Sequence, residues 1–193
     1  NVMRIVGGKY GGFKINSPKN FQIRPTSDRL KESIFSIIES EKYSNCIEGK
    51  LFLDLFTGTG SIGLEAFSRG ADTVYLLDKN SESIELSKKN IIKLNLGNLL
   101  EKQLFLLKKN ILNLNNLSLP IFDFIYIDPP YKTNYFNKIL DILKKNKNLN
   151  SDTLIFLESD KNFNFFHKDF KILTTKNYGL SFLHILKPIY HCL

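Results

Sequence analysis

A glycine-rich turn constrains the fold of this 193-residue chain more than any other feature. The turn, DLFTGTGS over residues 54–61, closes the apolar run Leu51–Leu55 and opens the segment Ser61–Ser68, which has helical spacing. A strand, a tight glycine turn and a helix in this order form a unit of an open α/β sheet, which holds ligands at the carboxyl ends of its strands. We therefore expect the rest of the chain to alternate between strands and helices.

The remaining pattern agrees with that expectation. Apolar runs of strand length follow at Thr73–Leu77, Leu104–Leu107, Phe122–Ile127 and Thr153–Leu157. Segments with helical period lie between them, at Ser81–Leu94 and Tyr135–Lys145. Phe170–Thr174 and Ser181–Lys187 flank a turn at residues 177–179 and predict a C-terminal antiparallel pair. Strands separated by helices favour a Rossmann-like α/β fold with a mainly parallel sheet.

A small extension precedes this pattern. Met3–Val6 and Phe13–Ile15 flank two glycine pairs, which predicts a small β-hairpin or a bent ribbon. A helix is expected to begin at Ser27 or Asp28, with one apolar face made of Leu30, Ile34, Ile37 and Ile38. A chain of this length fits one domain. We therefore divide it into an N-terminal hairpin and loop, residues 1–26, and an α/β domain, residues 27–193.

The basic charge of the chain is less informative than its arginines. The formal charge of +8 comes almost entirely from lysine, which we interpret as a solvated face. Arginine suits phosphate better, because its planar fork bonds two oxygens at once. Arg4, Arg24 and Arg29 all fall in the first thirty residues, so we predict contacts with RNA phosphates there. The alternative is ion pairing with Asp28 or Glu32 at the start of the helix.

Cysteine and histidine usage excludes several site types. Cys46 and Cys192 match no metal-binding or redox spacing. The three histidines, His167, His184 and His191, are not spaced like metal ligands either, so we predict that they are structural or exposed and that no metal is bound. No apolar run approaches the roughly 18 residues of a membrane span. We recognise no signal peptide and take Met3 as the native start. We expect a cytoplasmic monomer with no membrane partner.

The glycine turn predicts an adenosine cofactor. Gly58, Gly60 and Gly63 form G-x-G-x-x-G, and Asp78 follows 20 residues after Gly58, at the end of the next predicted strand. Glycines let the backbone approach a ligand, and a carboxylate at that place accepts hydrogen bonds from ribose hydroxyls. The motif alone does not separate a nicotinamide dinucleotide from S-adenosylmethionine (SAM).

Asp54 favours SAM, since a carboxylate beside the turn would repel a pyrophosphate but attract the amino group and sulfonium of SAM. The alternative is an end-of-strand carboxylate that bonds the amides of the turn itself. Phe56 lines the cofactor pocket or belongs to the core. Asn110 either bonds the adenine ring, with Ile111 packed on it, or caps a helix. We expect Glu65 to be solvated or to cap a helix.

The segment Asp128-Pro129-Pro130-Tyr131 predicts a clamp for a flat base that carries an exocyclic amine. Two prolines fix the backbone and leave its carbonyls free as acceptors. Asp128 and the Pro129 carbonyl would each accept one amine hydrogen, which favours a pyramidal nitrogen aimed at a methyl group. We also count Asp128 among the cofactor-binding residues. Tyr131 offers a face on which the base stacks. The alternative is a junction in which the prolines only end the strand.

These segments resemble the RsmD family of bacterial small-subunit (16S) rRNA (guanine-N2)-methyltransferases, within the Class I SAM-dependent methyltransferases. The resemblance covers Met3 to about Leu186. Besides the clamp, three segments carry it: the ribbon MRIVGG at residues 3–8, RPTSDRLKE at residues 24–32, which matches R-P-T-x-D-R-x-x-E, and the glycine turn. The turn matches D-x-F-A-G-S-G with threonines, Thr57 and Thr59, at both variable positions. The arginine-containing segment is the most specific to the family.

The resemblance implies methyl transfer from SAM to the N2 amine of one guanine in small-subunit rRNA, on an assembled or late-assembling subunit. It also implies that the N-terminal extension engages rRNA and that the target guanine is extruded into the site. Three alternatives remain open: an adenine-N6 DNA methyltransferase, a nicotinamide-linked oxidoreductase, and a non-catalytic ribosome-assembly factor.

Overall fold

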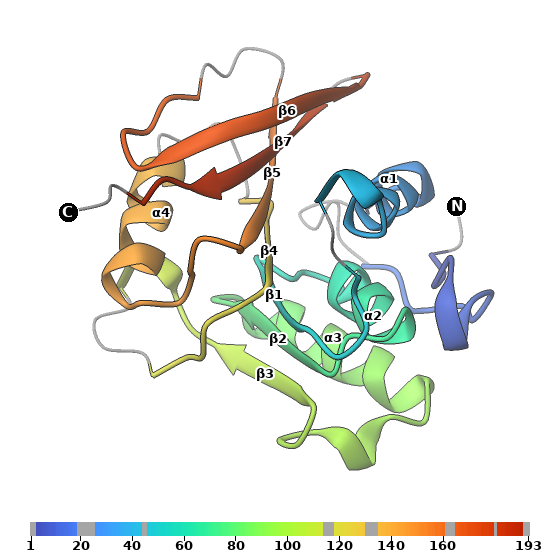
Figure 1. Ribbon diagram of the computed structural model, residues 1–193. Coiled ribbons are helices and arrows are strands. Elements are labelled where there is room, and N and C mark those ends of the chain that lie inside the picture. The colour runs from blue at the N-terminus through green and yellow to red at the C-terminus, as the bar shows by residue number, and fades with distance from the viewer. Residues whose placement is uncertain are drawn as a thin grey trace.

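The strands form a seven-stranded sheet, as the computed structural model shows (Figure 1). The structure describes residues 3–18, 26–43, 46–113, 118–129, 135–160, 165–179 and 181–190. The strand order is β3-β2-β1-β4-β5-β7-β6. The strands are β1 (Leu51–Leu55), β2 (Thr73–Asp78), β3 (Leu104–Lys108), β4 (Phe124–Ile127), β5 (Leu154–Asp160), β6 (Phe170–Tyr178) and β7 (Ser181–Pro188).

The predicted Rossmann-like fold is confirmed. Strands β3, β2, β1, β4 and β5 are parallel, and β7 pairs antiparallel with both β5 and β6. The main misjudgement concerns β6, which extends four residues past the predicted end at Thr174. It is an edge strand with many exposed polar side chains and a register shift between Ile172 and Thr174, so its sequence lacks a clear alternation.

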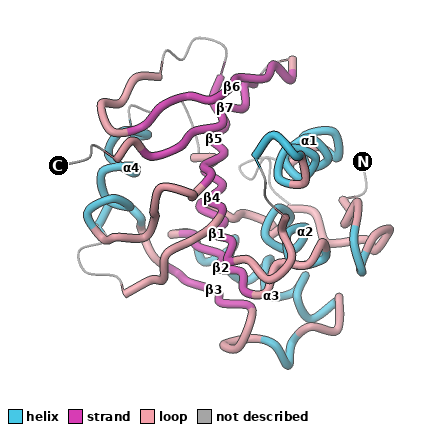
Figure 2. Tube along the Cα trace, in the orientation of Figure 1, coloured by secondary structure: helices cyan, strands magenta, loops and turns pink. Residues whose placement is uncertain are grey.

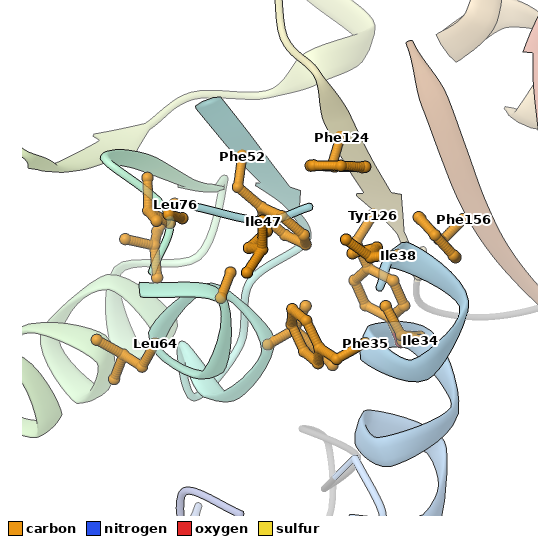
Figure 3. Close-up of a cluster of buried hydrophobic side chains, with 14 of the residues drawn as sticks. Ile34, Phe35, Ile38, Ile47, Phe52, Leu64, Leu76, Phe124, Tyr126 and Phe156 are labelled. Carbon is orange, nitrogen blue, oxygen red and sulfur yellow. The ribbon is translucent and has the colours of Figure 1, made fainter. Parts of the chain in front are cut away.

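Helices cover both faces of the sheet (Figure 2). They are α1 (Asp28–Ile38), α2 (Ser61–Ser68), α3 (Ser81–Lys93) and α4 (Tyr135–Lys145). The first three lie on one face and α4 on the other (Figure 1). The core is split in the same way. Phe35, Phe52 and Phe124 are buried between α1 and the sheet (Figure 3), whereas Phe136 and Ile155 belong to the cluster under α4.

The expected face of α1 is confirmed, since Leu30, Ile34, Ile37 and Ile38 are all buried. Ser27 is the N-cap, and its hydroxyl accepts a hydrogen bond from the Leu30 amide at 3.2 Å. Within the described ranges, none of the helices combines the length and apolar character that a membrane span requires.

The N-terminal segment forms a bent ribbon, one of the two predicted forms. Its arms are joined by the antiparallel bridge between Arg4 and Lys14 and by backbone bonds from Ile5 to Phe13 and from Ile15 to Met3, each at 2.9 Å. A 3-10 turn at Gly8–Tyr10 lies between the arms. The ribbon also binds α2, because the amides of Val6 and Gly7 donate to the carboxylate of Glu65 at 2.8 and 2.7 Å. The prediction for Glu65 was therefore wrong. The side chain is fully buried and binds the ribbon and Arg69 instead of facing solvent.

Candidate active site

The predicted cofactor turn and amine clamp lie on the same edge of the sheet. β1 pairs with β4 so that Leu55 lies opposite Ile127, and it pairs with β2 so that Leu55 lies opposite Leu77. The glycine turn after β1, Asp78 at the end of β2 and Asp128 after β4 are thus at the carboxyl ends of three adjacent parallel strands. This is where open α/β sheets bind ligands.

The turn after β1 needs unusual backbone angles. Gly58 and Gly60 have φ values of 55° and 78°, in the left-handed region that favours glycine. Phe56, half-buried, has a φ of 61°, which is strained for a bulky side chain. Such strain is typical of functional sites. Gly63 serves packing instead, because a Cβ there would lie 2.9 Å from the Leu76 side chain.

Asp54 is the residue before the last in β1, beneath this turn, and is buried. Its Oδ2 accepts hydrogen bonds from the Thr57 hydroxyl at 2.7 Å and from the Gly63 amide at 2.9 Å. Burial raises the pKa of Asp54 to about 7, against the lowering effect of these two bonds. The bonds are those of the alternative in which Asp54 holds the turn. Its contact with SAM stays a prediction.

Asp78 also binds the turn. Its Oδ2 accepts from the Gly58 amide at 3.1 Å, and its Oδ1 accepts from the Asn80 amide at 2.9 Å. Each carboxylate oxygen has a second lone pair, so these bonds fix the group while leaving it capacity as an acceptor. The predicted bond to ribose hydroxyls stays a prediction.

Helix α3 supports the turn through two side chains that were not predicted as part of the site. The Ser87 hydroxyl donates to the Gly58 carbonyl at 3.1 Å, and Asn90 Nδ2 donates to the Thr59 carbonyl at 2.8 Å. Both side chains are fully buried. Ser83, Ser87 and Asn90 follow helical spacing on the inner face of α3. Small polar residues on an inward helix face were the signal that could have revealed this support.

The expected adenine contacts lie at a helical cap. Asn110 Oδ1 accepts from the Leu112 amide at 3.1 Å and so caps the 3-10 turn Ile111–Asn113. Ile111 is buried in the cluster under α4. The capping alternative therefore accounts for the contact seen at Asn110, and an adenine contact stays a prediction.

The clamp is described only in its first half. Asp128 directly follows β4 and is half-buried, and Pro129 is buried. Pro130 and Tyr131 lie outside the described residues. A neighbouring pair was missed: the Tyr126 hydroxyl donates to Glu158 Oε2 at 2.7 Å, and both side chains are buried. Tyr126 reads from the sequence as an ordinary core strand residue, and Glu158 lies beyond the predicted end of β5 at Leu157.

The N-terminal arginines have different surroundings. The Arg4 Nε donates to Asp28 at 3.0 Å, and the buried Lys31 donates to the Arg4 carbonyl. Burial works against ionisation of Asp28, but the bonds from Arg4 and Lys31 outweigh it and lower its pKa. The guanidinium of Arg29 lies 5.9 Å from the centre of the Tyr178 ring. Arg24 lies outside the described residues, and RNA contacts stay a prediction for all three.

Two histidines contact protein groups, as expected for structural residues. His184 lies between the hydroxyls of Ser159 at 2.8 Å and Thr175 at 2.9 Å, and burial lowers its pKa. His167 bonds Asp141 at 3.0 Å. Asp141, His167 and Asp169 have potential metal-ligand atoms within 4.8 Å of one another, but Asp169 also pairs with Lys144 at 2.9 Å. His191 lies outside the described residues.

A polar hollow of about 700 Å³ lies at the opposite, amino-terminal edge of the sheet. Its lining includes Lys50 before β1, Asp123 before β4 and Lys187 near the end of β7. It is therefore separated from the glycine turn by the length of the strands, and it is not the predicted site.

Comparison with known proteins assigns the family. Residues 3–187 match a family described as Conserved hypothetical protein 95. The chain belongs to this family. It is 30% identical over 237 residues to the "Uncharacterized methylase RP545" of Rickettsia prowazekii, a match that covers 98% of this chain and 99% of that protein.

Other relatives of this chain bear a more specific name. The chain is 29% identical to the "Ribosomal RNA small subunit methyltransferase D" of Buchnera aphidicola, over 91% of this chain and 82% of that protein. The resemblance to the RsmD family is thereby confirmed. The solved structure of the putative methyltransferase yhhF from Escherichia coli has a TM-score of 0.82 at 22% identity and covers 98% of this chain and 99% of its own. That likeness concerns the fold, which is the Rossmann-like fold of methyltransferases.

Proposed function

We propose that this protein transfers a methyl group from SAM to the exocyclic N2 amine of a guanine in small-subunit rRNA, in the cytoplasm. The observation that carries the proposal is the juxtaposition of the glycine turn and Asp128 at the ends of adjacent strands β1 and β4. Had the two segments lain on opposite edges of the sheet, no methyl group could pass between their ligands.

The residues at this edge suit SAM. The left-handed backbone at Gly58 and Gly60 presents no side chains to a ligand, and Asp78 next to it is a fixed acceptor suited to the ribose hydroxyls. When bound, SAM supplies an electrophilic methyl group on a positively charged sulfur. No phosphate need be accommodated near Asp54, unlike in a dinucleotide site.

Asp128 and Pro129 would prepare the nucleophile. The lone pair of an exocyclic amine is delocalised into the base, so the nitrogen attacks poorly. Asp128 accepts one amine hydrogen and the Pro129 carbonyl accepts the other, which draws the nitrogen out of conjugation. The nitrogen forms its bond to the methyl carbon as the carbon–sulfur bond breaks. The alkylated nitrogen then loses a proton to water, and positioning supplies most of the rate.

The choice of substrate rests on the relatives and on the N-terminus. Several proteins at about 30% identity are named for the small ribosomal subunit. Arg4 and Arg29 lie on the surface of the ribbon and α1, available to RNA phosphates. The finer assignments, guanine N2 and an assembled or late-assembling subunit, come from the resemblance.

The test is methyl transfer with radiolabelled SAM to undermethylated small subunits, with free rRNA and duplex DNA as parallel substrates. We expect labelled rRNA in the subunits, and mass mapping should place the methyl group on one guanine. Label on adenine in DNA would favour the DNA methyltransferase instead. Binding of SAM without transfer to any substrate would favour the assembly factor, and stabilisation by a nicotinamide dinucleotide rather than SAM would favour the oxidoreductase.

A further inference from the structure

A second carboxyl group lies beside the clamp. Glu158 is in the carboxyl-terminal part of β5 and only 6% of its surface is exposed. The pairing of β4 with β5 matches Ile125 with Ile155 and Ile127 with Leu157. Asp128 and Glu158 are the next residues along the two chains, directly after this last pair. Two carboxyl groups therefore occupy neighbouring positions at the edge where the proposed target base would bind.

Tyr126 fixes the direction of Glu158. Its ring lies among Ile34, Ile38 and Phe156 in the core cluster between α1 and the sheet (Figure 3), and its hydroxyl donates to Glu158 Oε2 at 2.7 Å. Burial raises the pKa of Tyr126 well above its ordinary value, and the carboxylates of Asp128 and Glu158 raise it further. The phenol thus remains protonated and acts toward Glu158 as a donor.

Guanine and adenine differ at the atom next to their reactive amine. Guanine carries a donor, N1–H, beside its N2 amine. Adenine carries an unprotonated N1 beside its N6 amine. A pair of adjacent acceptor groups therefore complements guanine, with one carboxyl for the amine and one for N1–H. The same pair would face the lone pair of adenine N1, which disfavours adenine when the groups are desolvated.

We propose that Glu158 is a specificity-determining residue that accepts the N1–H of the target guanine while Asp128 accepts its N2 amine. This inference rests on the proposed function and adds the group that distinguishes guanine from other bases bearing an amine. Tyr126 is the positioning residue, because its hydroxyl holds one carboxyl oxygen of Glu158.

The test uses small subunits reconstituted with guanine or 2-aminopurine at the mapped position. 2-Aminopurine keeps the 2-amino group but has an unprotonated N1. We expect the wild-type protein to prefer guanine by about 10- to 100-fold in kcat/KM. In the Glu158→Gln variant, the Tyr126 hydroxyl still donates to the amide oxygen. The amide NH₂ then takes the place of the second carboxyl oxygen and can donate to N1 of 2-aminopurine. The preference for guanine over 2-aminopurine should fall at least about tenfold or invert.

Two further variants separate recognition from folding. Asp123→Asn makes the same change of carboxyl to amide just before the start of β4, where Asp123 bonds the Leu51 amide at 2.9 Å, and it should leave the preference unchanged. Tyr126→Phe combined with Glu158→Gln frees the amide to rotate and should weaken the altered preference. If the Glu158→Gln variant methylates guanine at the wild-type rate and keeps the wild-type preference for guanine over 2-aminopurine, this inference alone is overturned. Failure of the wild-type protein to methylate any subunit would overturn the proposed function.

Discussion

The two halves of the candidate site use their acidic side chains differently. On the cofactor half, near the ends of β1 and β2, Asp54 accepts from the Thr57 hydroxyl of the glycine turn and from the Gly63 amide in α2. Asp78 accepts from the amides of Gly58 and Asn80. On the base half, at the ends of β4 and β5, Glu158 is held by the hydroxyl of Tyr126. On the cofactor half, the carboxylates hold the backbone of the site in place. On the base half, the Tyr126 hydroxyl holds the carboxyl group of Glu158 in place. Substitutions on the first half should affect folding and binding together, and those on the second should affect transfer alone.

The largest expected effect is on the base half. Asp128→Ala should lower methyl transfer by about a hundredfold to a thousandfold, because the amine loses one of its two acceptors. Affinity for SAM, measured by calorimetry, and the denaturant midpoint should remain close to those of the wild-type protein. A parallel loss of SAM affinity would mean that Asp128 belongs to the cofactor half as well.

Asp54→Asn tests the cofactor half through pH. Burial raises the pKa of Asp54 from 3.8 to about 7, so the folded protein holds this proton more tightly than the unfolded chain does. The resulting stabilisation is fully present below about pH 4 and is lost as the pH rises through about 7. Between these limits the free energy of unfolding falls by about 1.4 kcal/mol for each step of one in pH.

Urea unfolding between pH 4 and pH 8 measures this effect as the difference between the two proteins. The free energy of unfolding of the wild-type protein should fall relative to that of Asp54→Asn as the pH rises. Asparagine can still accept the bonds from Thr57 and Gly63, so the variant should fold. A constant difference across this range would show that Asp54 is ionised throughout.

Asp78→Ala should lower both the stability of the protein and its affinity for SAM, each by a smaller amount than the effects above. Loss of the acceptor for the Gly58 and Asn80 amides should destabilise the protein by about 1–2 kcal/mol and lower the affinity for SAM by about tenfold. Asp72→Ala, just before the start of the same strand and exposed, is the matched control. If the control and Asp78→Ala bind SAM equally well, Asp78 has no part in the cofactor site.

Asn110→Ala should have the smallest effect and decides between two roles. Loss of the cap on Leu112 should destabilise the protein by about 0.5–1 kcal/mol, as seen by thermal unfolding. If Asn110 acts only as a cap, its replacement by alanine should leave the affinity for SAM unchanged. A fall of severalfold in affinity would instead support the predicted adenine contact.

Sequence reasoning predicted most of the fold because the five parallel strands are nearly continuous apolar runs, separated by helices with clear starts. The ends of β1 and α4 lie at the predicted residues. The pattern failed in β6, where an exposed strand face replaces hydrophobic alternation.

The candidate site was predictable only where motif residues follow a strand. Gly58, Asp78 and Asp128 could be found in this way. Glu65 and Glu158 could not, since the reason for burying each carboxyl is a partner far away in the sequence: the amides of residues 6 and 7 for one, and the Tyr126 hydroxyl for the other. Long-range hydrogen bonds leave no periodic signal in the chain.

Asn90 joins parts of the molecule that would meet different ligands. Its Oδ1 accepts from the Asn16 amide at 2.7 Å, while its Nδ2 donates to the Thr59 carbonyl at 2.8 Å. One amide group therefore spans the gap between the N-terminal segment and the glycine turn. In the proposed function the N-terminal segment binds rRNA and the glycine turn binds SAM, so Asn90 would couple these two binding events.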